Sequence, residues 1–477
     1  MGSATCADNV MPPPRTPAEA TLAARPARRP GGRLLRPPRL TFARYGTALT
    51  VVLGAYMLFD RAAAYLRVPG TPLYLGECLL VLGILTCASA PGYLRSALRD
   101  EPILAIVAAI VLWGLARAVP NAGTYGVIDT VRDSALWYYS LFAVIAVAAT
   151  LASPRLPDRL VDLLARRTPV LLLWLPIVVV IQKVTHIGVH VPGSTVSVVS
   201  SKDGNVAVVT FIALAAMWLV PWSRRSPSSR KAWSLIAMAG ILMAGTQNRG
   251  GLVAVSLAAL IGLLMNRRLI RPAVSGALVV VALIALATPF IPHTGGTSRR
   301  SISPTQLVQN IASVAGVGKA PDTQGTQQAR ERQWSFVLGL EFDQGKMLYG
   351  FGSGPNLGFG QATGTGDETL RVPHNSHVDV IARLGLIGLG LWVLLWSSWF
   401  YRLGRARARF LRGGQSRRRG MVDLCIVAAV AILTNAFFDP SLEGAQVGAL
   451  LWTVFGLGLV LTNPRWTSRT RLAAEAA

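Results

Sequence analysis

Two histidines stand three residues apart at the start of a long apolar run, in the stretch RVPHNSHVDVIARLGLIGLGL at residues 371–391. The chain has only five histidines, so this pair is a notable use of titratable side chains. A neutral imidazole accepts protons well near pH 7, which makes His374 a candidate general base, with Asn375 and His377 as supporting groups. Two alternatives stay open. In one, Asn375 or Ser376 simply caps a helix. In the other, the two histidines bind a metal, for which no third ligand is evident.

A second candidate is Arg249 in the stretch GTQNRGGL, residues 245–252, which forms a tight turn between two apolar segments. A guanidinium group binds a phosphate through two parallel hydrogen bonds, so Arg249 suits a diphosphate ligand. Gly250 next to it would let the backbone approach that ligand closely. The alternative is that Arg249 reaches lipid phosphates at the membrane surface.

A third candidate for the functional site is the stretch ARERQW, residues 329–334. Arg330 and Trp334 are four residues apart and share one face of a helix, whereas Arg332 lies on another face. The alternative is a solvated amphipathic helix with an anchoring tryptophan. The nearby glycines 350, 352 and 354 follow no predicted strand and precede no Lys-Ser/Thr pair, so they form neither a dinucleotide-binding motif nor a P-loop.

The elements that must position these residues are membrane helices. The chain is 52% hydrophobic and only 14% charged, which is too apolar for a soluble enzyme of 477 residues. Continuous apolar runs favour helices over a β-barrel. The sequence predicts about 12 transmembrane helices, at residues 46–59, 72–89, 102–118, 134–152, 168–188, 205–222, 232–246, 250–266, 273–292, 378–401, 421–437 and 445–462.

The net charge of +25 does not indicate nucleic-acid binding, because the arginines stand in short clusters between apolar runs. Such clusters mark cytoplasmic loops, and their placement predicts a multi-pass protein of the cytoplasmic membrane with both termini inside. The expected organisation is a disordered basic tail (1–45), nine transmembrane helices (46–292), a large extracytoplasmic loop with short amphipathic helices (293–373), three further helices (374–462) and a cytoplasmic tail (463–477). His374, Arg249 and Arg330 all fall on the extracytoplasmic side.

Three stretches in this order resemble the O-antigen ligase and polymerase superfamily of bacterial membrane glycosyltransferases. TQNRGGLVAV resembles the family's polar-polar-Arg-Gly segment, with Asn248 where the family often has serine. ARERQWSFVLGLEFDQGKMLYGFGSGPN is similar to its Arg, Trp and Gly-x-Gly-x-Gly block. PHNSHVDVIARLGLIGLGL resembles its His-Asn segment and Gly-x-x-Gly helix. The resemblance covers residues 205–460; the first 200 residues fit by helix number only.

The resemblance implies an all-α architecture like that of the GT-C membrane glycosyltransferases, and transfer of a glycan from a polyprenyl-diphosphate carrier to a lipid or glycan acceptor. It implies that Arg249, with Arg330 or Arg332, binds the diphosphate and that His374 activates the acceptor hydroxyl, without cofactor or metal. Direct displacement would invert the anomeric configuration. The choice between ligase and polymerase stays open, and a transporter or a lipid-linked oligosaccharide flippase is the alternative class of function.

Overall fold

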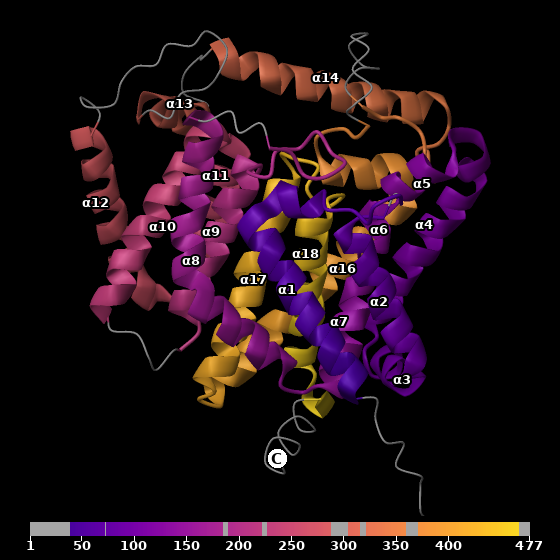
Figure 1. Cartoon of the computed structure of the whole chain (residues 1–477), viewed down its shortest axis with the longest axis horizontal. Coiled ribbons are helices and arrows are strands. Elements are labelled where there is room, and N and C mark those ends of the chain that lie inside the picture. Colours follow the sequence, from indigo (N-terminus) through magenta and orange to yellow (C-terminus); the bar gives the residue numbers. More distant parts are fainter. Residues whose placement is uncertain are drawn as a thin grey trace, which may run out of the picture. The chain divides into compact units, whose positions relative to one another are not determined.

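The computed structural model of the chain describes residues 39–71, 73–184, 189–221, 227–287, 304–314, 321–358 and 371–466. These residues form helices and connecting loops, with two isolated β-bridges as the other regular contacts (Figure 1). In chain order the helices are α1 (Arg39–Ala64), α2 (Leu75–Ser89), α3 (Pro91–Asp100), α4 (Ile103–Tyr125), α5 (Val127–Asp133), α6 (Ala135–Tyr138), α7 (Leu141–Ala152), α8 (Leu156–Val184), α9 (Asp203–Leu219), α10 (Pro227–Gln247), α11 (Arg249–Met265), the 3-10 helix η2 (Arg267–Leu269), α12 (Ile270–Ala287), α13 (Pro304–Val314), α14 (Pro321–Asp343), α16 (Ser376–Arg412), α17 (Ser416–Ala436) and α18 (Ala445–Thr462).

The all-helical membrane class is supported, but the number of about 12 spans is not. Each predicted apolar stretch overlaps a helix in the described part of the chain. Seven of these helices are long and apolar enough to cross a membrane, and the number rises to nine if two bent helix pairs each count as one span. Helices α2, α9 and α11 have 15, 17 and 17 residues. About 20 residues usually cross the hydrocarbon core, so these shorter helices leave the predicted number of about 12 spans unconfirmed.

Helix α1 begins at Arg39, so the boundary at residue 45 predicted for the N-terminal tail is wrong. Residues 39–45 continue the first helix, and Phe42 and Tyr45 on it are buried. The arginines in this stretch led to the prediction of a solvated tail, whereas its apolar side chains pack in the core. Residues 1–38, the rest of the predicted tail, lie outside the described part of the chain.

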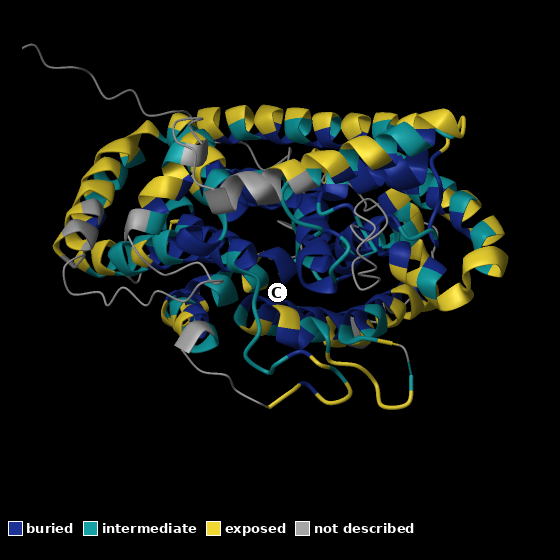
Figure 2. Cartoon of the chain, turned by 90° about the horizontal axis from the view of Figure 1, so that it is seen from above, coloured by how far each residue is buried: buried dark blue, intermediate teal, exposed yellow. Residues whose placement is uncertain are grey.

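The core forms around α17 and α18. Helix α17 packs against α9, α11, α16 and α18, and α18 packs against α7 and α1 as well. Figure 2 shows buried residues gathered between the helices and exposed residues on the outward faces of the peripheral ones. Apolar side chains on an outward face are expected where lipid, rather than water, is the solvent.

Helix α16 contains a break that the sequence did not predict. Gly385 has a φ of 66°, outside the helical range. The backbone N–H of Leu386 donates to the carbonyl of Met347 at 2.9 Å, and the carbonyl of Ala382 accepts from Phe351 N–H at 2.7 Å. The 347–352 loop therefore supplies the hydrogen bonds that the broken helix loses.

The glycine run at 350–354 has a structural explanation in this break. A Cβ atom on Gly350 would lie 2.5 Å from the backbone carbon of Arg383, and one on Gly352 would lie 2.3 Å from the carbonyl oxygen of Arg117. Both glycines also have positive φ, of 73° and 79°. The spacing of glycines thus lets a loop approach two helices closely.

Two helices occur among the described residues of the long 293–373 stretch. On α13, Asn310 is buried and its side-chain amide donates to the carbonyls of Gly245 and Thr246 at 2.9 and 2.8 Å, which caps the end of α10. Helix α14 runs across one end of the membrane helices (Figure 1) and packs against α16. These two helices lie over the end of the molecule where α11 and α16 begin.

Candidate functional site

A short segment after α17 brings the three candidate motifs together. Residues 437–439 contact all of them. The ring of Phe437 lies 5.6 Å from that of Trp334 and 6.3 Å from that of His377. A Cβ atom on Gly250 would lie 2.3 Å from the Cβ of Phe438, so these two residues touch. Stretches far apart in sequence, at 249–250, 330–334 and 374–377, therefore meet at one place.

His374 sits in the loop directly before α16 and is half-buried. Its φ of 35° is unusual for a residue with a side chain. Its backbone N–H donates to the carbonyl of Val372 at 2.9 Å, which closes a tight turn around Pro373. Within the described part of the chain the imidazole makes no hydrogen bond.

Charged neighbours act on His374. Burial lowers the pKa of its imidazole below the usual range, and the positive charges of Arg330 and Lys202 lower this pKa further, against the opposing charge of Asp439. A lowered pKa keeps the imidazole neutral at pH 7, the form that accepts a proton. The site therefore favours the base form of His374.

Asn375 and His377 have structural contacts. Asn375 is the N-cap of α16, as one of the alternatives predicted: its side-chain oxygen accepts from the N–H groups of His377 and Val378 at 2.9 and 3.2 Å. The Nε2 of His377 lies 2.9 Å from the carbonyl oxygen of Leu433. Because a carbonyl only accepts, Nε2 carries the proton and donates. His377 thus ties α16 to α17, which leaves His374 as the candidate base.

Arg249 is the first residue of α11 and is half-buried. Asn248 caps this helix, because its side-chain oxygen accepts from Gly251 N–H at 3.1 Å. Gly250 and Gly251 are buried, and a Cβ on Gly251 would lie 2.8 Å from the Cα of Gly204 on α9. The two glycines therefore press the start of α11 against α9 and residue 438.

Arg330 and Arg332 differ in place. Arg330 is half-buried, and its charge reaches His374. Trp334, one helical turn further along α14, donates its indole N–H to the carbonyl of Pro373 at 2.9 Å. Arg332 is exposed on α14. Its predicted part in diphosphate binding has no support in this geometry, because a neighbouring helical position two residues away points in a different direction.

Sequence reasoning missed the charged pair Lys202 and Asp439. The Lys202 ammonium lies 2.8 Å from the Asp439 carboxylate, and both side chains are largely buried. The backbone N–H of Lys202 also donates to the buried Asp60 at 2.7 Å, at the kink in α1. A signal existed in the sequence, since Lys202 is one of few lysines and precedes the polar start of an apolar span. Its partner stands 237 residues away.

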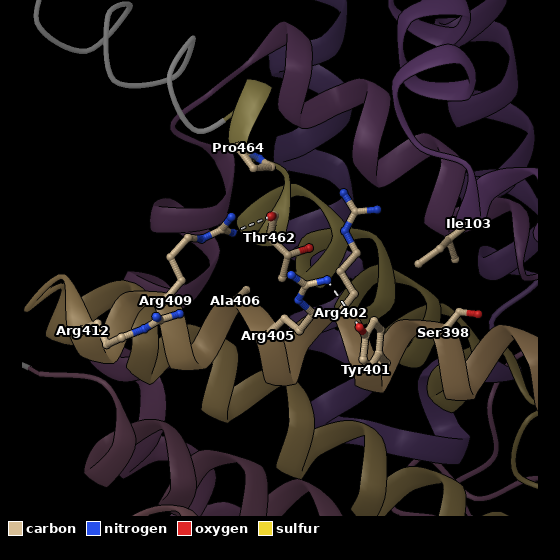
Figure 3. A pocket seen from close by; sticks show the side chains of 10 residues that line it. All are labelled: Ile103, Ser398, Tyr401, Arg402, Arg405, Ala406, Arg409, Arg412, Thr462 and Pro464. Atoms are coloured by element: carbon tan, nitrogen blue, oxygen red, sulfur yellow. Dashed lines mark hydrogen bonds between the residues drawn. The ribbon is translucent and has the colours of Figure 1, made fainter.

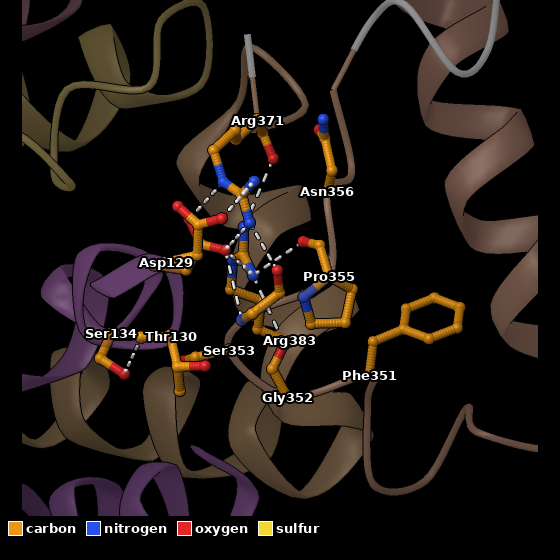
Figure 4. Close-up of polar contacts among 12 residues, drawn as sticks. Asp129, Thr130, Ser134, Phe351, Gly352, Ser353, Pro355, Asn356, Arg371 and Arg383 are labelled. Atoms are coloured by element: carbon orange, nitrogen blue, oxygen red, sulfur yellow. Dashed lines mark hydrogen bonds and ion pairs between the residues drawn. The ribbon is translucent and has the colours of Figure 1, made fainter. Parts of the chain in front are cut away.

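An ion-pair network, buried at Arg383, Asp379 and Asp133 and partly exposed at Asp129, supports the loop that carries His374 (Figure 4). The Arg383 side chain is fully buried; it lies 3.0 Å from Asp379 and 3.2 Å from Asp133. Arg371 lies 3.2 Å from the same Asp133 and 3.1 Å from Asp129. The guanidinium of Arg383 also donates to the carbonyl of Arg371 at 3.4 Å. The network joins α5, the first turn of α16 and the loop at 371, three residues before His374.

A buried carboxyl lies beside the cap of α16. The hydroxyl of Ser376 lies 2.7 Å from an oxygen of Glu443, in the loop between α17 and α18. Burial raises the pKa of Glu443 well above its usual range, and the charge of Asp379 raises this pKa further. This loop also contains Asp439, so the 437–443 connection places two acidic side chains beside the start of α16.

The arrangement places cationic groups around an unpartnered neutral imidazole. The charges of Arg330 and Lys202 lower the pKa of His374, while Asp439, the ion-pair partner of Lys202, opposes them. Arg249 begins α11, at the positive end of that helix dipole. No group of three or more His, Cys, Asp and Glu side chains that suits a metal ion occurs among residues with a described position. His186 and His293 lie outside the described residues. The site can therefore bind an anion next to a proton acceptor.

Comparison with known proteins gives no family by itself: no protein-family model matches the chain, and no curated protein matches it.

Proposed function

We propose that the chain is a membrane glycosyltransferase that moves a glycan from a polyprenyl-diphosphate carrier to an acceptor hydroxyl at the outer face of the cytoplasmic membrane. One observation carries the proposal. Residues 437–439 contact the elements that bear Arg249, Arg330 and His374, and these are the three residues that the resemblance selects. A diphosphate needs cations, and an acceptor hydroxyl needs a base.

In the proposed reaction His374 accepts the proton of the acceptor hydroxyl. The hydroxyl oxygen forms a bond to the anomeric carbon, and the bond from that carbon to the diphosphate oxygen breaks. The leaving diphosphate takes the electron pair, and Arg249 and Arg330 offset its growing negative charge. The attack from the opposite face inverts the anomeric configuration. The lowered pKa and positive φ of His374 support its part, because strained backbone clusters at active sites.

The test uses the full chain purified in detergent and supplied with polyprenyl-diphosphate oligosaccharide, without nucleotide. Release of polyprenyl diphosphate is followed by chromatography, with host membranes added as acceptor. We expect release by the wild type and a loss of about 10²–10⁴-fold in His374→Ala, the typical contribution of a general base. Arg330→Gln is compared with Arg332→Gln, its exposed neighbour, and the first variant alone should lose activity.

The same preparations separate transfer from flipping. A flippase needs cations for the diphosphate but no proton acceptor, so His374→Ala would leave flipping in liposomes intact. Retained transfer in a well-folded His374→Ala variant would overturn the proposed mechanism. Absence of diphosphate release by the wild type, with flipping preserved, would replace the transferase by a transporter. The glycan product, joined to lipid or to a second carrier-linked repeat, distinguishes ligase from polymerase.

A further inference from the structure

A pocket lies along the last turns of α16 (Figure 3). His374 stands just before the first residue of this helix, at its other end. Its volume is about 500 Å³, within the range of about 300–1,000 Å³ that ligand pockets have. One face of the last turns of α16 forms most of the wall, and the start of α4 and the end of α18 complete it. The lining residues are Ile103, Ser398, Tyr401, Arg402, Arg405, Ala406, Arg409, Arg412, Thr462 and Pro464.

The spacing along α16 explains why four arginines meet here. Positions 402, 405, 409 and 412 recur every three or four residues and so share one helical face. Helix α16 has 37 residues, whereas about 20 cross the hydrocarbon core. Its last turns therefore extend past the apolar layer. Tyr401, with 65% of its surface exposed, lies just before them, where aromatic rings mark the membrane interface.

The charge in this pocket is not balanced. Arg402 forms an ion pair with the buried Glu101. Arg405 donates to the Tyr401 hydroxyl at 3.4 Å, and Arg409 donates to the Thr462 carbonyl at 2.9 Å. Arg412 donates to a carbonyl of its own helix at 3.5 Å. As far as the described residues go, none of the last three arginines contacts a carboxylate, so three uncompensated positive charges surround one cavity.

The lining combines these charges with apolar surface. Ile103, Ala406 and Pro464 form apolar parts of the wall beside the guanidinium groups. A free inorganic anion would use the arginines alone, whereas a phospholipid would place its phosphate on the arginines and its glycerol and upper acyl chain on the apolar wall. Basic pockets between membrane helices at the cytoplasmic side have this recognition chemistry for lipid head groups.

We infer that the pocket at the end of α16 binds the head group of an anionic phospholipid through Arg405, Arg409 and Arg412. The guanidinium groups bind the phosphate oxygens through paired hydrogen bonds. This inference does not depend on the glycosyltransferase proposal, because the pocket and His374 lie at opposite ends of α16. The pocket also differs from the arginine clusters that only orient a membrane protein, because those clusters need positive charge near the membrane but no cavity.

The test measures lipid retention by native mass spectrometry of the full chain in detergent. Delipidated protein is titrated with phosphatidylglycerol or phosphatidylcholine of the same acyl chains. We expect at least tenfold tighter binding of phosphatidylglycerol. The triple variant Arg405→Gln/Arg409→Gln/Arg412→Gln should lose this selectivity. The matched triple variant Arg267→Gln/Arg268→Gln/Arg271→Gln, at exposed positions on η2 and at the start of α12, should keep it.

A double variant controls for misfolding of the triple variant. Arg405→Gln/Arg412→Gln leaves the contact of Arg409 with Thr462 intact and should still lose at least fivefold in phosphatidylglycerol binding. Equal loss in the matched triple variant would show diffuse charge attraction and overturn the site. Competition by millimolar inorganic phosphate as strong as that by the lipid would assign the pocket to a free anion instead and also overturn the inference.

Discussion

The indole nitrogen of Trp334 lies 2.9 Å from the carbonyl oxygen of Pro373, the residue directly before His374. This bond joins α14, which bears Arg330, to the loop that bears the candidate base. The Trp334 ring also packs against Phe437. In the proposed reaction, the distance between the diphosphate and the base would therefore depend on this tryptophan.

Trp334→Phe removes the bond and keeps a ring against Phe437. A neutral hydrogen bond contributes about 0.5–1.5 kcal/mol net, so we expect a loss of about 3- to 10-fold in glycan transfer, with little change in thermal stability. Initial rates of diphosphate release measure it. Phe336→Leu, an exposed position on the same helix, is the control. An unchanged rate in Trp334→Phe would show that the bond does not position the loop.

Gly250→Ala places a methyl group into Phe438. The obstructing atom is the Cβ of Phe438, at 2.3 Å, so rotation of the ring cannot relieve the contact. The start of α11 must shift, and a shift of about 1 Å in a site can cost about 10²-fold in rate. We expect at least a tenfold loss of transfer in this variant.

Two control variants test the cause of the loss in Gly250→Ala. Gly339→Ala on α14 adds a methyl group with nothing within 4 Å and should keep full activity. Gly250→Ala combined with Phe438→Gly removes the obstructing Cβ and should recover part of the rate. No recovery would mean that the loss has another origin than this contact.

Arg383→Gln breaks the ion-pair network that holds residue 371. The guanidinium and its partners Asp133 and Asp379 are buried, and removal of one partner leaves uncompensated buried charge. Such a loss costs about 3–5 kcal/mol. We expect a lower unfolding temperature in detergent by tryptophan fluorescence. Arg332→Gln, an exposed arginine, should unfold as the wild type does. Equal unfolding temperatures for both variants would contradict the network's role.

Lys202→Gln tests the charges around His374 through the pH profile. In the wild type the imidazole pKa is lowered, so the neutral base persists below pH 6.5 and the acid limb of kcat/KM lies there. Removal of Lys202 takes away a positive charge and leaves Asp439 unpaired. Both changes raise the imidazole pKa, which moves the acid limb to higher pH.

We expect kcat/KM of Lys202→Gln, expressed relative to the maximum of this variant, to fall more at pH 6 than at pH 8. Lys231→Gln, an exposed lysine at the start of α10, should leave the limb in place. The contrary outcome is an acid limb of kcat/KM that stays in place or moves to lower pH in Lys202→Gln. That outcome would exclude His374 as the titrating group or Lys202 as its neighbour.

The sequence by itself determined the helical membrane class. Apolar runs, glycine-flanked turns and short arginine clusters are local features, and helices form from local hydrogen bonds. The cap at Asn375 was predictable for the same reason, since a polar side chain there bonds N–H groups within three residues. The number of spans was not predictable in this way, because the length and bending of each helix depend on how it packs against its neighbours.

Tertiary structure alone decided which polar groups share a site. Arg330 lies near enough to His374 to lower its pKa, and Lys202 pairs with Asp439 across 237 residues. The break at Gly385 forms because the 347–352 loop offers replacement hydrogen bonds, which no pattern within α16 reveals. Charge pairing and loop docking join segments that are distant in the chain, so their energies depend on packing that local sequence does not encode.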